Sequence, residues 1–315
     1  MSQSVNTNII SLNSQRNLNT SQTSLSTSMQ RLSSGLRVNS AKDDAAGLAI
    51  AERMSSQVRG MNVAVRNAND AISLSQTAEG ALGKIGDNLQ RMRELAVQSR
   101  NATNSDGDRA NLQKEFKELQ AEIQRTVEGT KFNGQNLFAS DAASSLSFQV
   151  GAGTSGQDRI DIDGAVLGGG SAMGAAAAVS AYESGGSTGE VDLMATVFGA
   201  WDGTNGVAIG GAASAGTAVA GTGQIDDAIN AIDKALDLIN DKRASFGASQ
   251  NRFEAVISNL QTNIENQSAA RGRIMDADFA AETANLSRAQ ILQQAGTAMV
   301  AQANSLPQQV LSLLN

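Results

Sequence analysis

The fold is decided by residues 225–264, which read IDDAINAIDKALDLINDKRASFGASQNRFEAVISNLQTNI. The large apolar residues of this stretch recur at alternating steps of four and three, which is the spacing of a coiled-coil helix face. This ladder predicts one long helix and consists of Ile225, Ile229, Ile232, Leu236, Ile239, Phe246, Phe253, Ile257, Leu260 and Ile264. Arg243 and Gln250 interrupt it. The expected packing residues include Ile229, Leu236, Phe253, Ile257, Leu260 and Ile264.

The first half of the chain carries a matching pattern. Apolar residues at steps of four and three predict a helix that begins near Asp43 and runs to about residue 99. The turn-forming stretch NATNSDGD (101–108) separates it from a shorter predicted helix over 109–129. In KFNGQNLF (131–138) the Asn-Gly pair is a turn signal that ends the helical half.

Both chain ends predict helices with narrower apolar seams. Leu18, Leu25 and Leu32 recur every seven residues, with Met29 in the intermediate spacing. After a joint at RGRIMDAD (271–278), a second ladder consists of Leu292, Gly296, Met299, Ala303, Leu306, Val310 and Leu313. Pro307 lies inside this ladder, where it either kinks the helix or opens a last short one. Helices in the N-terminal part of the chain can pair antiparallel with helices in the C-terminal part. The order of the helices therefore predicts a mainly α fold, a long antiparallel coiled-coil rod formed by both chain ends.

The last stretch, residues 289–315, contains no charged side chain. A helix that faces water normally carries Lys and Glu on its wet face, whereas this one carries Gln and Asn. Neutral amides can be buried against copies of themselves without placing like charges together. We therefore expect both ends to be largely disordered alone and to order among many copies, through a heterologous contact that gives a helical filament. An ordinary solvated coiled coil and a membrane-surface helix, which would carry Lys or Arg beside aromatic residues, fit this composition less well.

Composition excludes several functional classes. The 315 residues include no Cys and no His, which removes disulfides, thiolate metal sites and the commonest general base. A net charge of −7 argues against general nucleic-acid binding. Asp158, Asp161 and Asp163 are more typical of a solvated strand edge than of a calcium site. No enzyme activity, cofactor, signal peptide or membrane span is expected, and these features alone would favour the cytoplasm.

Residues 140–223 differ from the rest of the chain. Gly, Ala, Ser and Thr dominate, and LSFQV (146–150) and RIDID (159–163) alternate as strands do. VDLMATVFGAW (191–201) also has strand-like composition. A small β domain and an irregular, solvent-facing insert both fit this Gly-rich segment.

Six segments resemble bacterial flagellins in flagellin order. They are RLSSGLRVNSAKDDAAGLAIAERM (31–54), LQRMRELAVQS (89–99), KFNGQNLF (131–138), SQNRFEAVISNL (249–260), RIMDADFAAETANLSRAQIL (273–292) and SLPQQVLSLLN (305–315). The resemblance covers about 1–139 and 224–315, whereas the centre resembles no segment of the family.

The resemblance implies a structural subunit of the bacterial flagellar filament, used for swimming motility. Residues 1–43 and 272–315 would form the inner tube, packed through Leu18, Leu25, Leu32, Leu292, Met299, Leu306, Val310 and Leu313. Residues 44–139 and 224–271 would form the outer tube, and 140–223 would be a variable, surface-exposed region. The chain would be exported unfolded by the flagellar type III apparatus, without a cleaved signal peptide, to an extracellular location.

The resemblance also implies partners. These are further copies of the chain, an export chaperone on the C-terminal tail, a filament cap and the hook-associated junction proteins. A hook–filament junction protein shares the helical plan and is one alternative, and a secreted membrane translocator is another. A host Toll-like receptor would recognise Arg91, Leu95 and Glu115, of which the two charged residues otherwise read as a solvated helix face.

Overall fold

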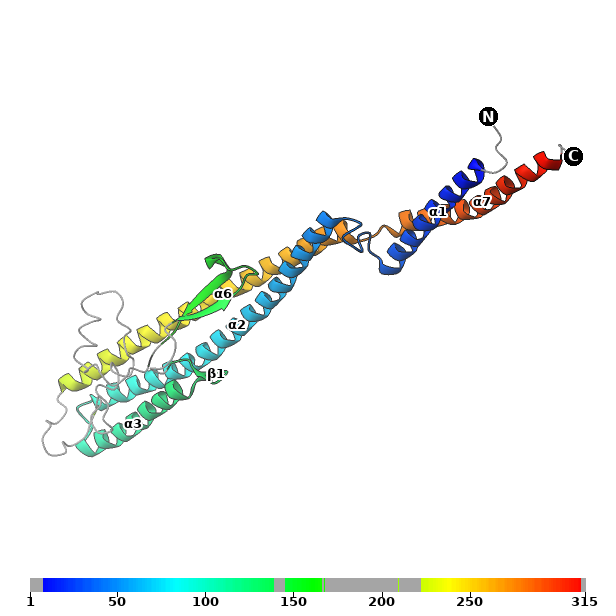
Figure 1. The fold of residues 1–315 in the computed structure, drawn as a ribbon. Coiled ribbons are helices and arrows are strands. Elements are labelled where there is room, and N and C mark those ends of the chain that lie inside the picture. The colour runs from blue at the N-terminus through cyan, green and yellow to red at the C-terminus, as the bar shows by residue number, and fades with distance from the viewer. Residues whose placement is uncertain (1–7, 139–144, 166, 168–208, 210–221, 313–315) are drawn as a thin grey trace. The chain divides into compact units, whose positions relative to one another are not determined.

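The computed structural model describes residues 8–138, 145–165, 167, 209 and 222–312 (Figure 1). Its long helices are α1 (Ile9–Ser34), α2 (Ala45–Ser99), α3 (Asp106–Gly129), α6 (Thr222–Met275) and α7 (Phe279–Ser312). Two antiparallel hairpins pair β1 (Lys131–Phe132) with β2 (Gln135–Asn136), and β3 (Ser145–Gln149) with β4 (Arg159–Asp163), which follows the short 3-10 helix η1 (Gly156–Asp158). The mainly α fold with a small strand-containing centre is therefore confirmed.

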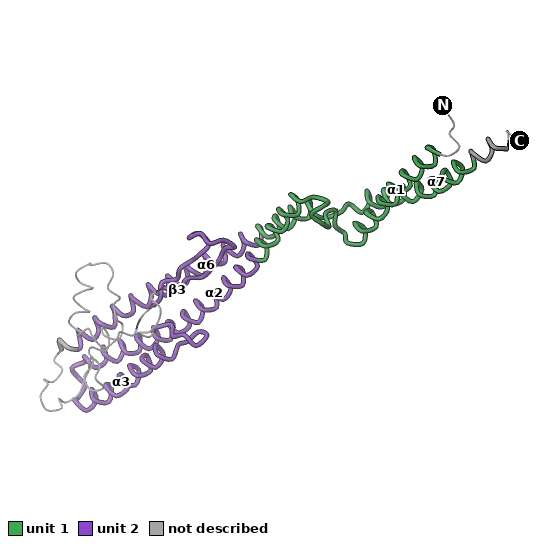
Figure 2. Tube along the Cα trace, viewed as in Figure 1, with its two compact units in different colours: residues 1–59, 262–315 green, residues 60–261 purple. Residues whose placement is uncertain are grey.

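The chain divides into two compact units (Figure 2). Unit 1 comprises residues 1–59 and 262–315, and unit 2 comprises residues 60–261. In unit 1, α1 and α7 run antiparallel, because Asn8 bonds to Ala303 and Arg31 pairs with Glu282. In unit 2, α2 and α6 are antiparallel as well, since Gln250 donates to Glu79 while Arg93 binds Asp233. The predicted antiparallel pairing of the two chain halves is thus present within each unit.

The core of unit 2 lies between α2, α3, α6 and the β3–β4 hairpin. Leu82, Phe116, Phe138 and Phe253 have no exposed surface. Of the six packing residues predicted on α6, Phe253 and Leu260 are buried, Ile264 is half-buried, and Ile229, Leu236 and Ile257 pack against the edge of the core. The four/three ladder therefore lies on the face of α6 that turns toward the core of unit 2.

The described part of residues 140–223 has one exposed face and one buried face. The β3–β4 hairpin confirms the two alternating strands and buries Ile160 and Ile162 on its inner face. Leu167 and Ile209 are also fully buried in the core of unit 2. The alternation that predicts a strand also predicts one buried face, and here that face packs against the helices. The segment 191–201 lies outside the described residues.

Local signals place most helix ends and turns. Asn133 and Gly134 have φ values of 49° and 81°, the left-handed pair that a two-residue hairpin turn requires. Gly35 ends α1 with φ 71°, and the Asp278 carboxylate accepts the N–H groups of Ala280 and Ala281 at the start of α7. The helix α7 continues to Ser312, so Pro307 does not end it. None of the helices, over the residues described, is long and apolar enough to span a membrane.

The start of α3 predicts a pH dependence. Asp108 accepts hydrogen bonds from the Ser105 hydroxyl at 2.6 Å and from the Ser105 N–H at 3.1 Å. The hydroxyl first, and then the N–H, hold the pKa of Asp108 below its ordinary value of 3.8. A carboxylate with a lowered folded-state pKa stabilises the protein above its ordinary pKa, and this contribution is lost as the pH falls through the lowered value.

Replacing Ser105 by Ala should therefore lower the melting temperature near neutral pH and reduce the further loss on acidification. Thermal unfolding followed by circular dichroism at about pH 7 and about pH 3 measures both effects. Ser55→Ala on α2 is the matched serine control. Equal acid sensitivity of Ser105→Ala and the parent chain would contradict this assignment.

Candidate assembly surface

The contact between α1 and α7 is made largely of small residues. Ser11, Ser21 and Ser28 of α1 are buried, as are Ala289 and Ala303 of α7. At Gly296 a Cβ atom would lie only 3.1 Å from Cδ1 of Leu18, so the glycine permits the helices to approach closely. Small side chains bring two backbones together but bury little apolar area, so this pair gains limited hydrophobic stabilisation.

Polar groups complete the contact. The Asn8 side chain donates to the Ala303 carbonyl at 2.7 Å, and the Ser11 hydroxyl donates to Oδ1 of Asn304 at 2.8 Å. At the other end of the pair, Arg31 lies 3.8 Å from Glu282, whose exposed fraction is only 8%. These bonds fix the register of the two helices, but they do not replace an apolar core.

The predicted seam residues differ in their burial within the α1·α7 pair. Leu18, Leu25 and Leu32 are half-buried, in register with the buried serines. In contrast, Met29, Leu292 and Met299 are 58%, 53% and 59% exposed in the single chain, so the packing of Leu292 and Met299 in an inner tube stays a prediction. Small residues occupy the contact and turn the larger ones outward. Leu306 and Val310 belong to α7, but their side chains, like the whole of Leu313, lie outside the described residues.

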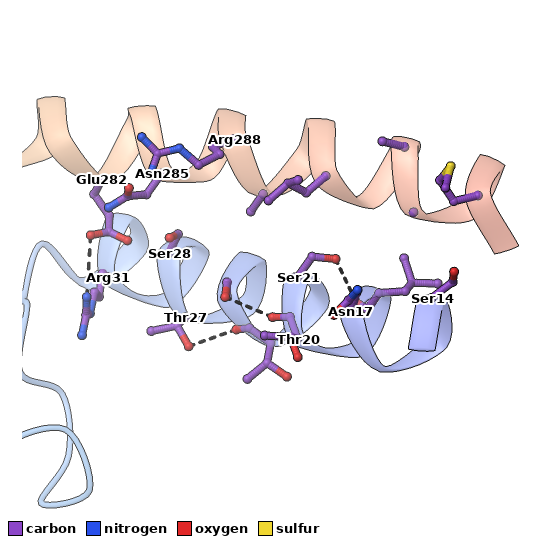
Figure 3. A pocket seen from close by; sticks show the side chains of 18 residues that line it. Ser14, Asn17, Thr20, Ser21, Thr27, Ser28, Arg31, Glu282, Asn285 and Arg288 are labelled. Atoms are coloured by element: carbon purple, nitrogen blue, oxygen red, sulfur yellow. Dashed lines mark hydrogen bonds and ion pairs between the residues drawn. The ribbon is translucent and has the colours of Figure 1, made fainter. Parts of the chain in front are cut away.

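A groove of about 810 Å³ runs along one side of the pair (Figure 3). Its α1 wall is rich in hydroxyl and amide side chains, among them Asn17, Thr20 and Ser24. Its α7 wall includes the apolar Leu292 and Met299, and Arg31, Glu282 and Arg288 lie at one end. In Figure 3, Arg31 and Glu282 reach toward each other across the gap between the helices.

Exposed large apolar residues gather on these two helices. They are Ile9, Ile10, Leu12 and Met29 on α1, and Phe279, Ile291, Leu292 and Met299 on α7. Charged groups are sparse beside them, since Arg16 is the one charged residue of 9–30 and none follows Arg288. A surface of this kind suits burial against an uncharged, apolar partner.

The residues expected at a receptor differ in exposure. Arg91 of α2 binds Glu115 of α3 through Nη2 at 2.7 Å, and its Nη1 binds Glu94 at 2.9 Å. The bond to Glu115 first, and then that to Glu94, raise the pKa of Arg91. Leu95 has no exposed surface, so it supports the core in this conformation and presents nothing to a partner. The resemblance alone could not reveal that burial.

The described part of the chain provides no group of three or more acidic residues placed to hold a metal ion. Asp158 instead accepts hydrogen bonds from the hydroxyl and N–H of Ser155, which lower its pKa, with the hydroxyl the larger cause. Its role is therefore that of a local cap next to β4.

Comparison with known proteins gives consistent matches over both helical regions. The model of the bacterial flagellin N-terminal helical region matches residues 5–143, and that of the C-terminal helical region matches residues 229–314. A flagellin of Halalkalibacterium halodurans is 40% identical, over 98% of this chain and 99% of its own. Flagellin D of Vibrio anguillarum is 36% identical over the whole of both chains.

A solved structure also matches. A protein of Vibrio parahaemolyticus described as flagellar hook-associated aligns with 74% of this chain and 100% of its own, with a TM-score of 0.52. At 14% identity, this likeness concerns the fold alone.

Proposed function

The chain belongs to the bacterial flagellin family, a family of structural proteins rather than enzymes, and from this premise we propose how it assembles and is recognised. It is a structural subunit of the flagellar filament, an extracellular polymer that serves motility. Subunits polymerise through the outer surface of α1 and α7, and the exposed apolar residues of that surface carry this proposal.

A single chain leaves several large apolar residues of α1 and α7 exposed. Ile10, Leu292 and Met299 are each more than half exposed, and few charges accompany them. Their burial against further copies would gain the hydrophobic stabilisation that the serine-rich and alanine-rich contact between α1 and α7 does not provide. The groove on one chain can receive apolar residues from a different part of the same surface on the next chain, which is a heterologous contact. Repeating such a contact builds a helical filament when the subunits do not close into a ring.

A chain that ends at Arg288 tests this proposal. It lacks most of α7 and is expected to remain unpolymerised when seeded with filament fragments of the parent chain, because the assembly surface is incomplete. Electron microscopy and sedimentation report polymer, and the melting of unit 2 reports whether the rest of the chain stays folded. Filaments of normal abundance and length from this variant would exclude the proposed surface.

The same surface requires protection before assembly. We propose export in an unfolded form through the flagellar type III apparatus, with an export chaperone covering the uncharged C-terminal tail. A filament cap would guide addition at the growing tip, and hook-associated junction proteins would contact the filament at its base. The full-length flagellin relatives support a filament subunit over a junction protein or a membrane translocator.

We further propose that a host Toll-like receptor recognises the exposed face of α2 and α3 through Arg91 and Glu115. The two side chains are about half exposed and already ordered by their mutual bond, so they form a preorganised polar pair. Leu95, which is buried, would act by holding α2 against the core.

Arg91→Ala should reduce the affinity for a receptor ectodomain at least about tenfold. Charge-assisted hydrogen bonds are strong, and a few residues of an interface, often arginines, carry most of its binding free energy. The melting temperature should change little, since an exposed ion pair contributes little to stability. Arg125→Ala removes another exposed Arg–Glu pair, in which the Arg125 side chain is 74% exposed, and is the control on α3. Equal binding by Arg91→Ala and the parent, measured by surface plasmon resonance, would refute this role.

A further inference from the structure

Ile209 is a described residue of the central region that lies apart from any helix or strand. It is fully buried within the core of unit 2. Its N–H donates to Oε1 of Gln113 on α3 at 2.7 Å, and its carbonyl accepts the hydroxyl of Ser99 on α2. Both peptide polar groups of one residue are therefore bound by side chains of two helices, distant from it in sequence.

Burial alone does not dictate this arrangement. Ser75 is a fully buried serine of the same helix, and its hydroxyl bonds to the Ala71 carbonyl of its own preceding turn at 2.8 Å. Ser99 is equally buried but donates to residue 209 instead. A buried serine in a helix can donate its hydroxyl to a carbonyl of the preceding turn. Ser99 donates to the carbonyl of Ile209 instead, which indicates that its side chain is placed to bind the backbone at residue 209.

The chemistry of the site defines what it accepts. The Ser99 hydroxyl donor and the Gln113 amide oxygen acceptor bind the carbonyl and the N–H of one residue, which are the two groups that a neighbouring strand binds in a sheet. The core cluster to which Ile209 belongs also includes Phe116 and Ile232, so its apolar surroundings suit an aliphatic side chain and make the burial of a carboxylate costly.

We propose that Ser99 and Gln113 form a peptide-binding site for the backbone of one residue with a branched aliphatic side chain, occupied within the same chain by Ile209. The Leu167 N–H donates to the Phe138 carbonyl at 2.8 Å, and Leu167 is fully buried. Leu167 and Ile209 thus anchor the chain on both sides of residues 168–208. Replacing either anchor by a polar residue would bury an unpaired group in this core and destabilise unit 2.

The test compares variants of the full chain in urea unfolding of unit 2. Ile209→Asp should raise the ratio of unfolded to folded protein at least about 100-fold, whereas Ile209→Val should raise it less than about tenfold. Ser99→Ala should raise the ratio several-fold in the parent but less than about twofold in an Ile209→Asp background, because the site is then empty. Equal effects of Ser99→Ala in both backgrounds would overturn the proposal.

A second variant separates the anchor from the segment before it. Residues 168–208 are replaced by a flexible Gly-Ser segment of the same length, with Leu167 and Ile209 retained. Its unfolding midpoint should match that of the parent, and adding Ile209→Asp should reproduce the loss. A midpoint lowered as far by the Gly-Ser replacement as by Ile209→Asp would contradict the assignment of the anchor to residue 209.

Discussion

A chain carrying Leu292→Lys and Met299→Lys is expected to remain monomeric at concentrations at which the parent chain grows filaments. Both side chains are more than half exposed on α7, so the lysines can reach water in the free subunit and leave its folding intact. In a filament that buries this surface, each ammonium group would lose water without gaining a partner, which costs several kcal/mol. Since every ~1.4 kcal/mol is a factor of ten, the critical concentration should rise at least about 100-fold.

The measurement is the critical concentration for seeded growth, determined by sedimentation. Leu292→Gln with Met299→Gln separates charge from lost apolar area, and it should raise the critical concentration less than the lysine pair. Asn101→Lys with Thr103→Lys places the same added charge in the exposed turn between α2 and α3 of unit 2. If the α7 lysine variant polymerises at the parent's concentration, these two side chains are not buried by assembly.

Phe253→Ala is expected to lower the free energy of unfolding of unit 2 by about 3–5 kcal/mol, the usual cost of truncating a buried phenylalanine. Phe253 has no exposed surface, and its ring meets that of Phe148 edge to face with centroids 5.9 Å apart. The residue therefore joins α6 to β3, and its loss leaves a cavity between the helices and the hairpin.

Urea denaturation followed by circular dichroism gives this value. The matched control is Val97→Ala, because Val97 is 50% exposed and its truncation should cost less than about 0.5 kcal/mol. Phe148→Ala combined with Phe253→Ala should cost less than the sum of the single changes, since the two rings share one contact. A loss below about 1 kcal/mol for Phe253→Ala would mean that the hairpin does not pack on α6 in solution.

The sequence predicts the long helices of unit 2 well because large apolar residues line their inner faces. Phe253 and Leu260 occupy ladder positions and are buried, and the alternation of residues 159–163 identifies β4. The Asn-Gly pair at 133 and 134 identifies its turn because few other residues adopt two successive positive φ values.

The contact of the terminal helices is harder to predict for a physical reason. A search for large apolar residues selects Leu292 and Met299, whereas the helices meet through Ser21, Ser28 and Gly296. Small residues allow close approach but carry little hydropathy, so the real contact face gives a weak periodic signal. Because small residues fill the contact between α1 and α7, the larger apolar residues face solvent in the single chain, and these exposed residues form the proposed assembly surface.

Ile209 could not have been predicted as a core residue. It is a single aliphatic residue in a Gly-rich and Ala-rich segment, with no periodic neighbours that would mark it as buried. The bonds from Ser99 and Gln113 join positions about a hundred residues apart, and only the three-dimensional structure brings them together.

Hydrogen exchange of α1 and α7, compared between the free subunit and the filament, tests the central claim most directly. We predict that amides of both helices exchange with little protection in the monomer, because the small side chains between the helices bury too little apolar area to hold the pair together. In the filament the same amides should become protected to the level of the α2 and α6 core. Strong protection of α1 and α7 already present in the monomer would contradict the claim that these helices become stably ordered only among further copies.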